Sequence, residues 1–148
     1  MAATFFPQLP EGMSVTAYAA EEKWDDFYNY NKSSTVTVDT DTYYGSSGYS
    51  IKIINSDFNR AYTKKTITVK QNTFYRFTAM AKVEGYQRDP KANKDYGATL
   101  SIDDKQFSNG YIGSEWALQT LEFNSGDRTS VTLCLSNGAP TRNCKGTV

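Results

Sequence analysis

Residues 74–83 of the chain are Phe74-Tyr75-Arg76-Phe77-Thr78-Ala79-Met80-Ala81-Lys82-Val83. Apolar or aromatic side chains occupy positions 75, 77, 79, 81 and 83, and mostly polar side chains occupy the positions between them. Successive residues of a β-strand point to opposite faces, so this alternation places the two kinds of side chain on different sides. The stretch therefore predicts a long strand with one buried face and one polar face.

Shorter stretches with strand-like patterns lie on both sides of this strand. They are residues 35–39, 49–53, 61–69, 98–102, 116–123 and 129–136. Polar or Gly-containing segments separate them and predict turns at 44–48, 55–59, 70–73 and 124–127. Seven or eight short strands with regular turns and no predicted helix indicate an all-β, antiparallel β-sandwich.

The connection at residues 84–95 is the longest in the predicted sandwich and is rich in charged side chains. A structureless loop of about a dozen residues in a compact domain is more often functional or mobile than idle. Residues 1–23 show little periodicity and are interpreted as an N-terminal arm or a linker remnant, which leaves residues 24–148 as the sandwich. The chain stops at Val148 just as another strand begins, so we expect the last strand to be missing or its place to be filled otherwise.

Composition limits the classes of partner. The 148 residues include 16 basic and 16 acidic side chains, and this balance argues against a nucleic acid or an anionic membrane as partner. No apolar run approaches the roughly 20 residues of a membrane span. There is no histidine, which excludes histidine-dependent catalytic triads and imidazole metal sites. Eleven Tyr and two Trp in a neutral chain are typical of an extracellular β-protein.

The two cysteines leave two readings open. Cys134 and Cys144 flank a turn-like segment at residues 137–140. If the chain reverses near residue 139, the two side chains oppose each other across a hairpin and could form a disulfide. The other reading is a pair of buried or free thiols, because two cysteines alone do not settle the redox compartment.

Acidic residues offer little support for catalysis. Carboxylate pairs occur at Asp25-Asp26, Asp39 with Asp41, and Asp103-Asp104, but sixteen acids in a sandwich produce such pairs by chance. No phosphate-binding loop, nucleophile elbow or zinc spacing is present, so we do not expect an enzyme. Asp39 and Asp41 are two residues apart in an extended segment and are candidate ligands for a structural calcium. The alternative is that Asp39 and Asp41 are ordinary acidic residues of a turn and bind no metal.

Aromatic side chains carry the strongest functional signal. We expect five of them in the core. Four are at alternating strand positions, Tyr75, Phe77, Trp116 and Phe123, and the fifth is Trp24. Six others lie in or beside turns or on polar strand faces: Tyr43, Tyr62, Tyr86, Tyr96, Phe107 and Tyr111. Aromatic platforms beside hydrogen-bonding side chains are suited to sugar rings, which have apolar faces and polar edges.

Several motifs occur in an order that resembles a known family. They are Trp24-Asp25-Asp26-Phe27, Gly48-Tyr49-Ser50-Ile51-Lys52-Ile53, Phe74-Tyr75-Arg76-Phe77-Thr78-Ala79, Gly113-Ser114-Glu115-Trp116, Leu121-Glu122-Phe123 and Val131-Thr132-Leu133-Cys134-Leu135. From about residue 24 to 148, the chain resembles the jelly-roll carbohydrate-binding modules of families four, nine, sixteen and twenty-two. The resemblance implies a jelly roll and a non-catalytic accessory module, covalently linked to a catalytic domain of an extracellular polysaccharide-degrading enzyme such as a glycoside hydrolase.

The resemblance also implies a site. Such modules hold β-glucans, xylans or related polysaccharides in a groove on the concave sheet. The polar side of two strands then supplies Arg60, Tyr62 and Arg76, and the loop at 84–95 and its end supply Tyr86 and Tyr96. We expect these five residues to bind carbohydrate.

A second hypothesis follows from the abrupt end of the chain. An unfilled strand position presents unpaired backbone groups, which a neighbouring molecule can occupy by strand addition. Residues 13–18 are a candidate donor strand. The protein would then be a self-associating or domain-swapped extracellular structural or adhesive subunit.

Overall fold

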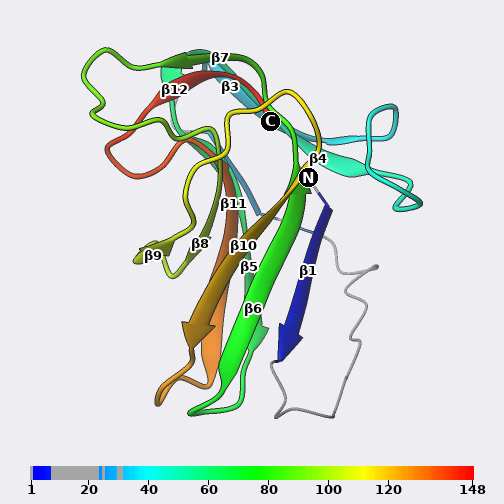
Figure 1. The fold of residues 1–148 in the computed structure, drawn as a ribbon, viewed down its shortest axis with the longest axis vertical. Coiled ribbons are helices and arrows are strands. Elements are labelled where there is room, and N and C mark those ends of the chain that lie inside the picture. The colour runs from blue at the N-terminus through cyan, green and yellow to red at the C-terminus, as the bar shows by residue number, and fades with distance from the viewer. Residues whose placement is uncertain (1, 8–23, 25, 30–31) are drawn as a thin grey trace.

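The computed structural model describes residues 2–7, 24, 26–29 and 32–148, and within them all regular structure is β-strand (Figure 1). The strands are β1 (Ala2–Pro7), β2 (Asp26–Asn29), β3 (Ser34–Asp39), β4 (Ser50–Asn59), β5 (Ala61–Thr68), β6 (Phe74–Ala81), β7 (Glu84–Arg88), β8 (Ala98–Ile102), β9 (Gln106–Phe107), β10 (Ala117–Asn124), β11 (Ser130–Asn137) and β12 (Cys144–Thr147). Their pairings are antiparallel. The predicted all-β, antiparallel fold class is confirmed.

The described strands form three sheets, with orders β1-β6-β10, β2-β5-β11-β8-β9 and β3-β4-β12-β7. Figure 1 shows the three-stranded sheet crossing in front of β5 and β11, with β3, β7 and β12 at one end of the molecule. The first two sheets therefore form the layers of a sandwich, and the four-stranded sheet extends it at one end.

The long alternating strand has the burial that its sequence predicts. Tyr75, Phe77, Ala79, Ala81 and Val83 are all buried. Tyr75 stacks on Phe123 of the neighbouring β10, with ring centroids 5.6 Å apart. Phe77 is fully buried and stacks on Trp24, with ring centroids 6.3 Å apart. The inward face of β6 thus anchors one layer of the core.

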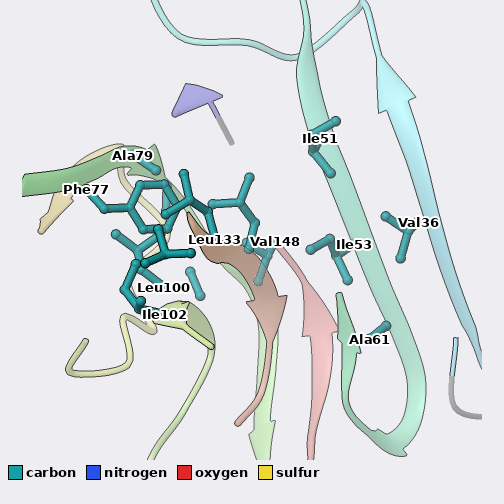
Figure 2. Close-up of a cluster of buried hydrophobic side chains, with 14 of the residues drawn as sticks. Val36, Ile51, Ile53, Ala61, Phe77, Ala79, Leu100, Ile102, Leu133 and Val148 are labelled. Carbon is teal, nitrogen blue, oxygen red and sulfur yellow. The ribbon is translucent and has the colours of Figure 1, made fainter. Parts of the chain in front are cut away.

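One core extends across all three sheets. Figure 2 shows Phe77 and Ala79 of β6 facing Leu100 and Ile102 of β8, while Ile51 and Ile53 of β4 lie at the other end of the cluster. These side chains are almost completely buried. Because β4 contributes to the same cluster as β6 and β8, the four-stranded sheet packs as part of the sandwich.

The turn predicted at residues 55–59 is wrong, since β4 continues to Asn59. Asn55 is buried, and its amide nitrogen donates to the carbonyl oxygens of Asn59 (3.0 Å) and Asn137 (3.1 Å). Asn59 is also buried and donates to Ser34 Oγ at 2.6 Å. Two of the polar side chains that resembled a turn thus belong to a buried hydrogen-bond network, which lets amide side chains occupy a strand.

The predicted loop at residues 84–95 is partly a strand. Its first five residues form β7, which pairs with β12. No residue of β7 is buried, and Gly85 has a φ of 64°. Edge strands with one paired side are often irregular and polar, so sequence alternation does not reveal them.

The C-terminal residues form a strand in the middle of a sheet. β12 lies between β4 and β7, and beyond it Val148 exchanges two backbone hydrogen bonds with Ile53, at 2.8 and 2.9 Å. The residues before Val148 are therefore paired on both sides, while the reading of a missing last strand stays a prediction. At the other end, residues 2–7 of the segment we assigned to an arm pair with β6 as β1. The proposed donor, residues 13–18, lies outside the described residues.

Candidate functional site

A small open hollow lies where the four-stranded sheet meets the start of β10. Its lining comes from the end of β3 and the loop after it, β4, the segment from Lys82 to the start of β7, the residue before β10, and the C-terminal end with β12. It consists of Asp39, Thr42, Ser50, Lys52, Lys82, Glu84, Trp116, Thr147 and Val148. Its volume is about 50 Å³. One water needs roughly 10–15 Å³, so the hollow accepts a few hydroxyl-sized groups.

Trp116 provides the only aromatic ring of this lining. The ring is half-buried, with Lys82 Nζ 5.9 Å from its centroid. On the rim, Tyr44 approaches it with centroids 5.9 Å apart and planes tilted by 56°. We expected Trp116 in the core, and this expectation is wrong: the ring lies at the surface of the hollow.

The sequence contained a signal for this position. Phe123 is buried on the core side of β10, and Trp116 is seven residues earlier, so the two have opposite parity along the strand. Side chains of opposite parity point to opposite faces. Trp116 therefore belongs on the same side as Leu118, which is 62% exposed, and not with Phe123.

Two ion pairs line the hollow. Lys52 Nζ lies 2.9 Å from Asp39 Oδ2, and Lys82 Nζ lies 2.7 Å from Glu84 Oε1. The hydrogen bond from Lys52 lowers the pKa of Asp39 to about 2 and raises that of Lys52 itself. The hydrogen bond from Lys82 likewise lowers the pKa of Glu84. Each carboxylate is thus matched by one ammonium group, and the charges of the two pairs cancel.

Asp39 and Ser50 also fix the start and end of the neighbouring loop at residues 40–49. The Asp39 carboxylate accepts the backbone N–H groups of Asp41 (2.8 Å) and Thr42 (3.2 Å). Ser50 Oγ donates to the Thr42 carbonyl at 2.7 Å. These bonds hold the base of the loop that carries Tyr44.

The calcium ligands predicted at Asp39 and Asp41 find no support in this geometry. Asp39 already accepts three donors, one of them the Lys52 ammonium, which would repel a cation. Across the described residues, no group of three or more acidic or cysteine side chains could hold a metal ion. Asp39 instead orders a loop and an ion pair.

The five predicted carbohydrate ligands do not form one groove, and none lines the hollow. Tyr62 is only 7% exposed, with the Arg60 guanidinium 4.6 Å and Lys64 Nζ 4.8 Å from its ring centroid. Arg60 and Lys64 both pair with Asp104, at 2.8 and 3.0 Å. Burial alone would raise the pKa of Asp104, but these two cations lower it. This cluster covers β5 and leaves little of the tyrosine ring for a ligand.

Tyr86 and Tyr96 come together elsewhere. Tyr86 Oη donates to Asp95 Oδ1 and accepts the backbone N–H of Tyr96, both at 3.1 Å. Burial, together with Asp95, raises the pKa of Tyr86 to about 12. The ring of Tyr96 is covered by the Arg142 guanidinium, 5.0 Å from its centroid. Both tyrosines are half-buried and serve to order the connection after β7.

Arg76 lies on β6 of the three-stranded sheet, to which neither the Tyr62 cluster nor the pair of Tyr86 and Tyr96 belongs. Its guanidinium pairs with Glu122 of β10 through contacts of 2.6 and 2.8 Å, and the pair is exposed. Arg76 and Trp116 share the outward parity of β6 and β10, because Glu122 is opposite Arg76 in the register. Of the five residues, Arg76 is therefore the one that shares a face with Trp116.

The hairpin that would bring Cys134 and Cys144 together is absent, because β11 and β12 belong to different sheets. Both cysteines are buried free thiols. The Cys144 thiol donates to Asn137 Oδ1 at 3.0 Å, and Cys134 Sγ lies 3.8 Å from Arg60 Nη2. Burial raises their pKa values to about 11 for Cys134 and about 12 for Cys144. Neither is a disulfide partner or a reactive nucleophile in this state.

Comparison of the chain with protein families, curated proteins and solved structures found no match. In the part of the chain that the structure describes, no helix has the length and hydrophobicity needed to cross a bilayer.

Proposed function

We propose that this protein is a non-catalytic carbohydrate-binding module, with the hollow at Trp116 as its binding site. The observation that carries the proposal is a half-buried indole ring in an open hollow whose other lining side chains, apart from Val148, are all polar or charged. Sites for small ligands combine an apolar platform with a few convergent polar groups. A sugar ring needs both, because its faces are apolar and its edge carries hydroxyls.

The polar walls offer the donors and acceptors that a sugar requires. Lys52 and Lys82 are donors, Asp39 and Glu84 are acceptors, and the Ser50 hydroxyl, whose proton goes to the Thr42 carbonyl, can accept. Each bond to a sugar hydroxyl replaces a bond to water, so each adds only about 0.5–1.5 kcal/mol. The proposed affinity is accordingly modest, and stacking on Trp116 supplies the orientation.

The titration of the acidic side chains favours binding over hydrolysis. A glycosidase needs a carboxylic acid whose pKa is raised so that it can protonate the leaving group. The pKa values of Asp39, Glu84 and Asp104 are instead lowered by neighbouring cations. In the hollow, both carboxyl groups are held as carboxylates, which suits them as hydrogen-bond acceptors.

A modest affinity is useful when the module is joined to an enzyme. Tethering makes the encounter of the catalytic domain with its substrate intramolecular and raises its effective concentration. We propose an extracellular polysaccharide-degrading enzyme as the covalent partner and a β-glucan or xylan as the target. The aromatic-rich, charge-balanced composition is compatible with that setting.

The test is affinity electrophoresis against soluble β-glucans, xylans, mannans and pectins, with and without a calcium chelator. We expect retardation by at least one neutral polysaccharide, unchanged by chelation, and its loss in Trp116→Ala. Phe74→Ala is the matched control, because Phe74 is an exposed aromatic (62%) on β6 that does not line the hollow. Retardation that persists in Trp116→Ala would show that the binding site lies elsewhere, and no retardation of the wild type by any polysaccharide would refute the proposed function.

A second candidate, self-assembly, is favoured by the edge of the four-stranded sheet. β3 is an outer strand of that sheet, and Val38 on it is 54% exposed. Edge strands offer unpaired backbone groups for pairing with another chain. The protein would then be a self-associating or domain-swapped structural subunit. Light scattering across a concentration series separates the two, since a strict monomer at high concentration eliminates this candidate.

A further inference from the structure

We infer that the hollow takes a single neutral sugar ring, a chain end or a one-residue branch, held between Trp116 and a movable Tyr44. This inference rests on the proposed function and names the ligand class and a second binding residue. It differs from the extended groove that the sequence resemblance implies, because the ligand makes contact through one residue and not along a strand.

The first argument is size. A hollow of about 50 Å³ takes the hydroxyl edge of one ring, and neighbouring residues of a polymer would lie outside it. The lining residues also come from five separate segments that converge on one point, whereas a chain-binding groove would follow the length of a strand. The contacts are therefore concentrated on one sugar residue.

The second argument is charge. Asp39 and Glu84 face the hollow with pKa values below their usual range, and each is matched by a lysine within 3 Å. A uronate carboxyl group would add a negative charge to a hollow in which two carboxylates and two ammonium groups already balance, so it gains no net attraction there. It would also lie close to two like charges, which costs affinity. A neutral sugar meets no such penalty, because its hydroxyls both donate and accept.

The third argument is Tyr44. Its ring is 47% exposed and touches Trp116 at 5.9 Å between centroids, which is a direct ring contact with no space for a sugar between the rings. A ligand that stacks on Trp116 must therefore displace Tyr44 or lie beside it. If the tyrosine moves outward by the thickness of a sugar ring, the two aromatics enclose the ligand.

The loop that carries Tyr44 has room for this movement. Gly45 and Gly48 have φ values of 63° and 74°, and a Cβ at either position would meet no atom within 4 Å. The hydroxyl of Ser47 lies 3.0 Å from the carbonyl oxygens of Tyr44 and Tyr49, which ties the tip into one unit. The tip is thus held together internally and exposed to solvent, and Asp39 and Ser50 anchor its base.

The experiment is calorimetric titration of the wild type, Tyr44→Ala, Tyr43→Ala and Trp116→Ala. The probes are glucose, xylose and mannose, their β-1,4-linked dimers and tetramers, and polygalacturonate. Tyr43 is the matched control, since it is adjacent in the sequence and similarly exposed (40%). We expect a neutral mono- or disaccharide to give the full affinity, Tyr44→Ala to weaken it roughly three- to tenfold, Tyr43→Ala to bind as the wild type, and polygalacturonate not to bind.

Three results overturn the inference while the proposed function survives. The first is an affinity that rises with every added sugar residue, and the second is a Tyr44→Ala variant that binds as tightly as the wild type; in both cases Trp116→Ala does not bind. Preferred binding of polygalacturonate would also overturn it, through the charge argument. Failure of every saccharide to bind the folded wild type refutes the inference and the proposed function together.

Discussion

Replacing Asn137 by alanine tests how the two largest sheets are joined. Asn137 is completely buried at the end of β11, and its side-chain nitrogen donates to the carbonyl oxygens of Gly146 (2.8 Å) and Ile53 (3.3 Å). Its side-chain oxygen accepts the Cys144 thiol at 3.0 Å. One amide thus links β11 to both β4 and β12, so its removal should loosen the junction between the sheets.

The expected loss follows from these contacts. The Ile53 carbonyl keeps a partner in the backbone N–H of Val148, but the Gly146 carbonyl and the thiol lose the bonds that Asn137 supplies. A lost hydrogen bond costs about 0.5–1.5 kcal/mol and a buried group left without a partner about 1–3 kcal/mol. We therefore expect Asn137→Ala to lower the free energy of unfolding by roughly 2–4 kcal/mol, which is a fall in Tm of roughly 5–15 °C.

Urea denaturation and differential scanning calorimetry measure this loss. The control is Asn93→Ala, which removes the same chemical group from an exposed position and should change stability by less than about 0.5 kcal/mol. A loss below about 1 kcal/mol for Asn137→Ala would refute the claim that this amide joins the sheets. An equal loss in both variants would show that the effect is not due to burial.

Three further predictions concern other parts of the molecule. Phe77→Ala should cost about 3–5 kcal/mol in urea denaturation, because Phe77 is fully buried; a loss under about 1.5 kcal/mol would contradict its place in the core. The pKa of Asp39 is lowered, so its pair with Lys52 stabilises the fold above pH 3.8 and ceases to do so as the pH falls through about 2. The titration of Asp39 followed by carboxyl NMR should have a midpoint near pH 2. A midpoint near pH 3.8 would show that Asp39 does not pair with Lys52. Cys134 and Cys144 should resist a thiol reagent in the native protein and react fully in guanidinium chloride; rapid native labelling, or no free thiol after denaturation, would contradict two buried thiols.

The strands that sequence predicts best have one buried face and one solvent-exposed face. β6 has a clear pattern because one side faces the core and the other reaches solvent at Phe74 and Arg76, and it ends two residues before its expected bound. β11 lies within one residue of its expected bounds, although its last five residues are all buried. The segment at residues 55–59 was misassigned because its asparagines are buried and paired with each other and with distant strands. Local chemistry cannot show that a polar residue has a partner 82 positions away, as Asn55 has in Asn137.

The candidate site was harder to predict for a related reason. Tyr62 and Trp116 are both aromatic residues near strand ends, but Tyr62 is covered by Arg60 and Lys64 whereas Trp116 lines an open hollow. Which aromatic ring remains accessible depends on contacts between strands, and these are set by register and topology. The parity of Trp116 relative to Phe123 was visible in the sequence and places Trp116 on the outer side. Its proximity to Lys52 and Glu84 depends on how the sheets pack.

The measurement that bears most directly on carbohydrate binding is the fluorescence of Trp116 in a Trp24→Phe variant. The chain has two tryptophans, and phenylalanine keeps an aromatic ring against Phe77, so this variant isolates the emission of the residue in the hollow. Titration with neutral mono- and oligosaccharides should give a saturable change in emission for at least one sugar. Emission that stays constant for every sugar, while the same variant binds a polysaccharide in electrophoresis, would place the binding site elsewhere and contradict the account.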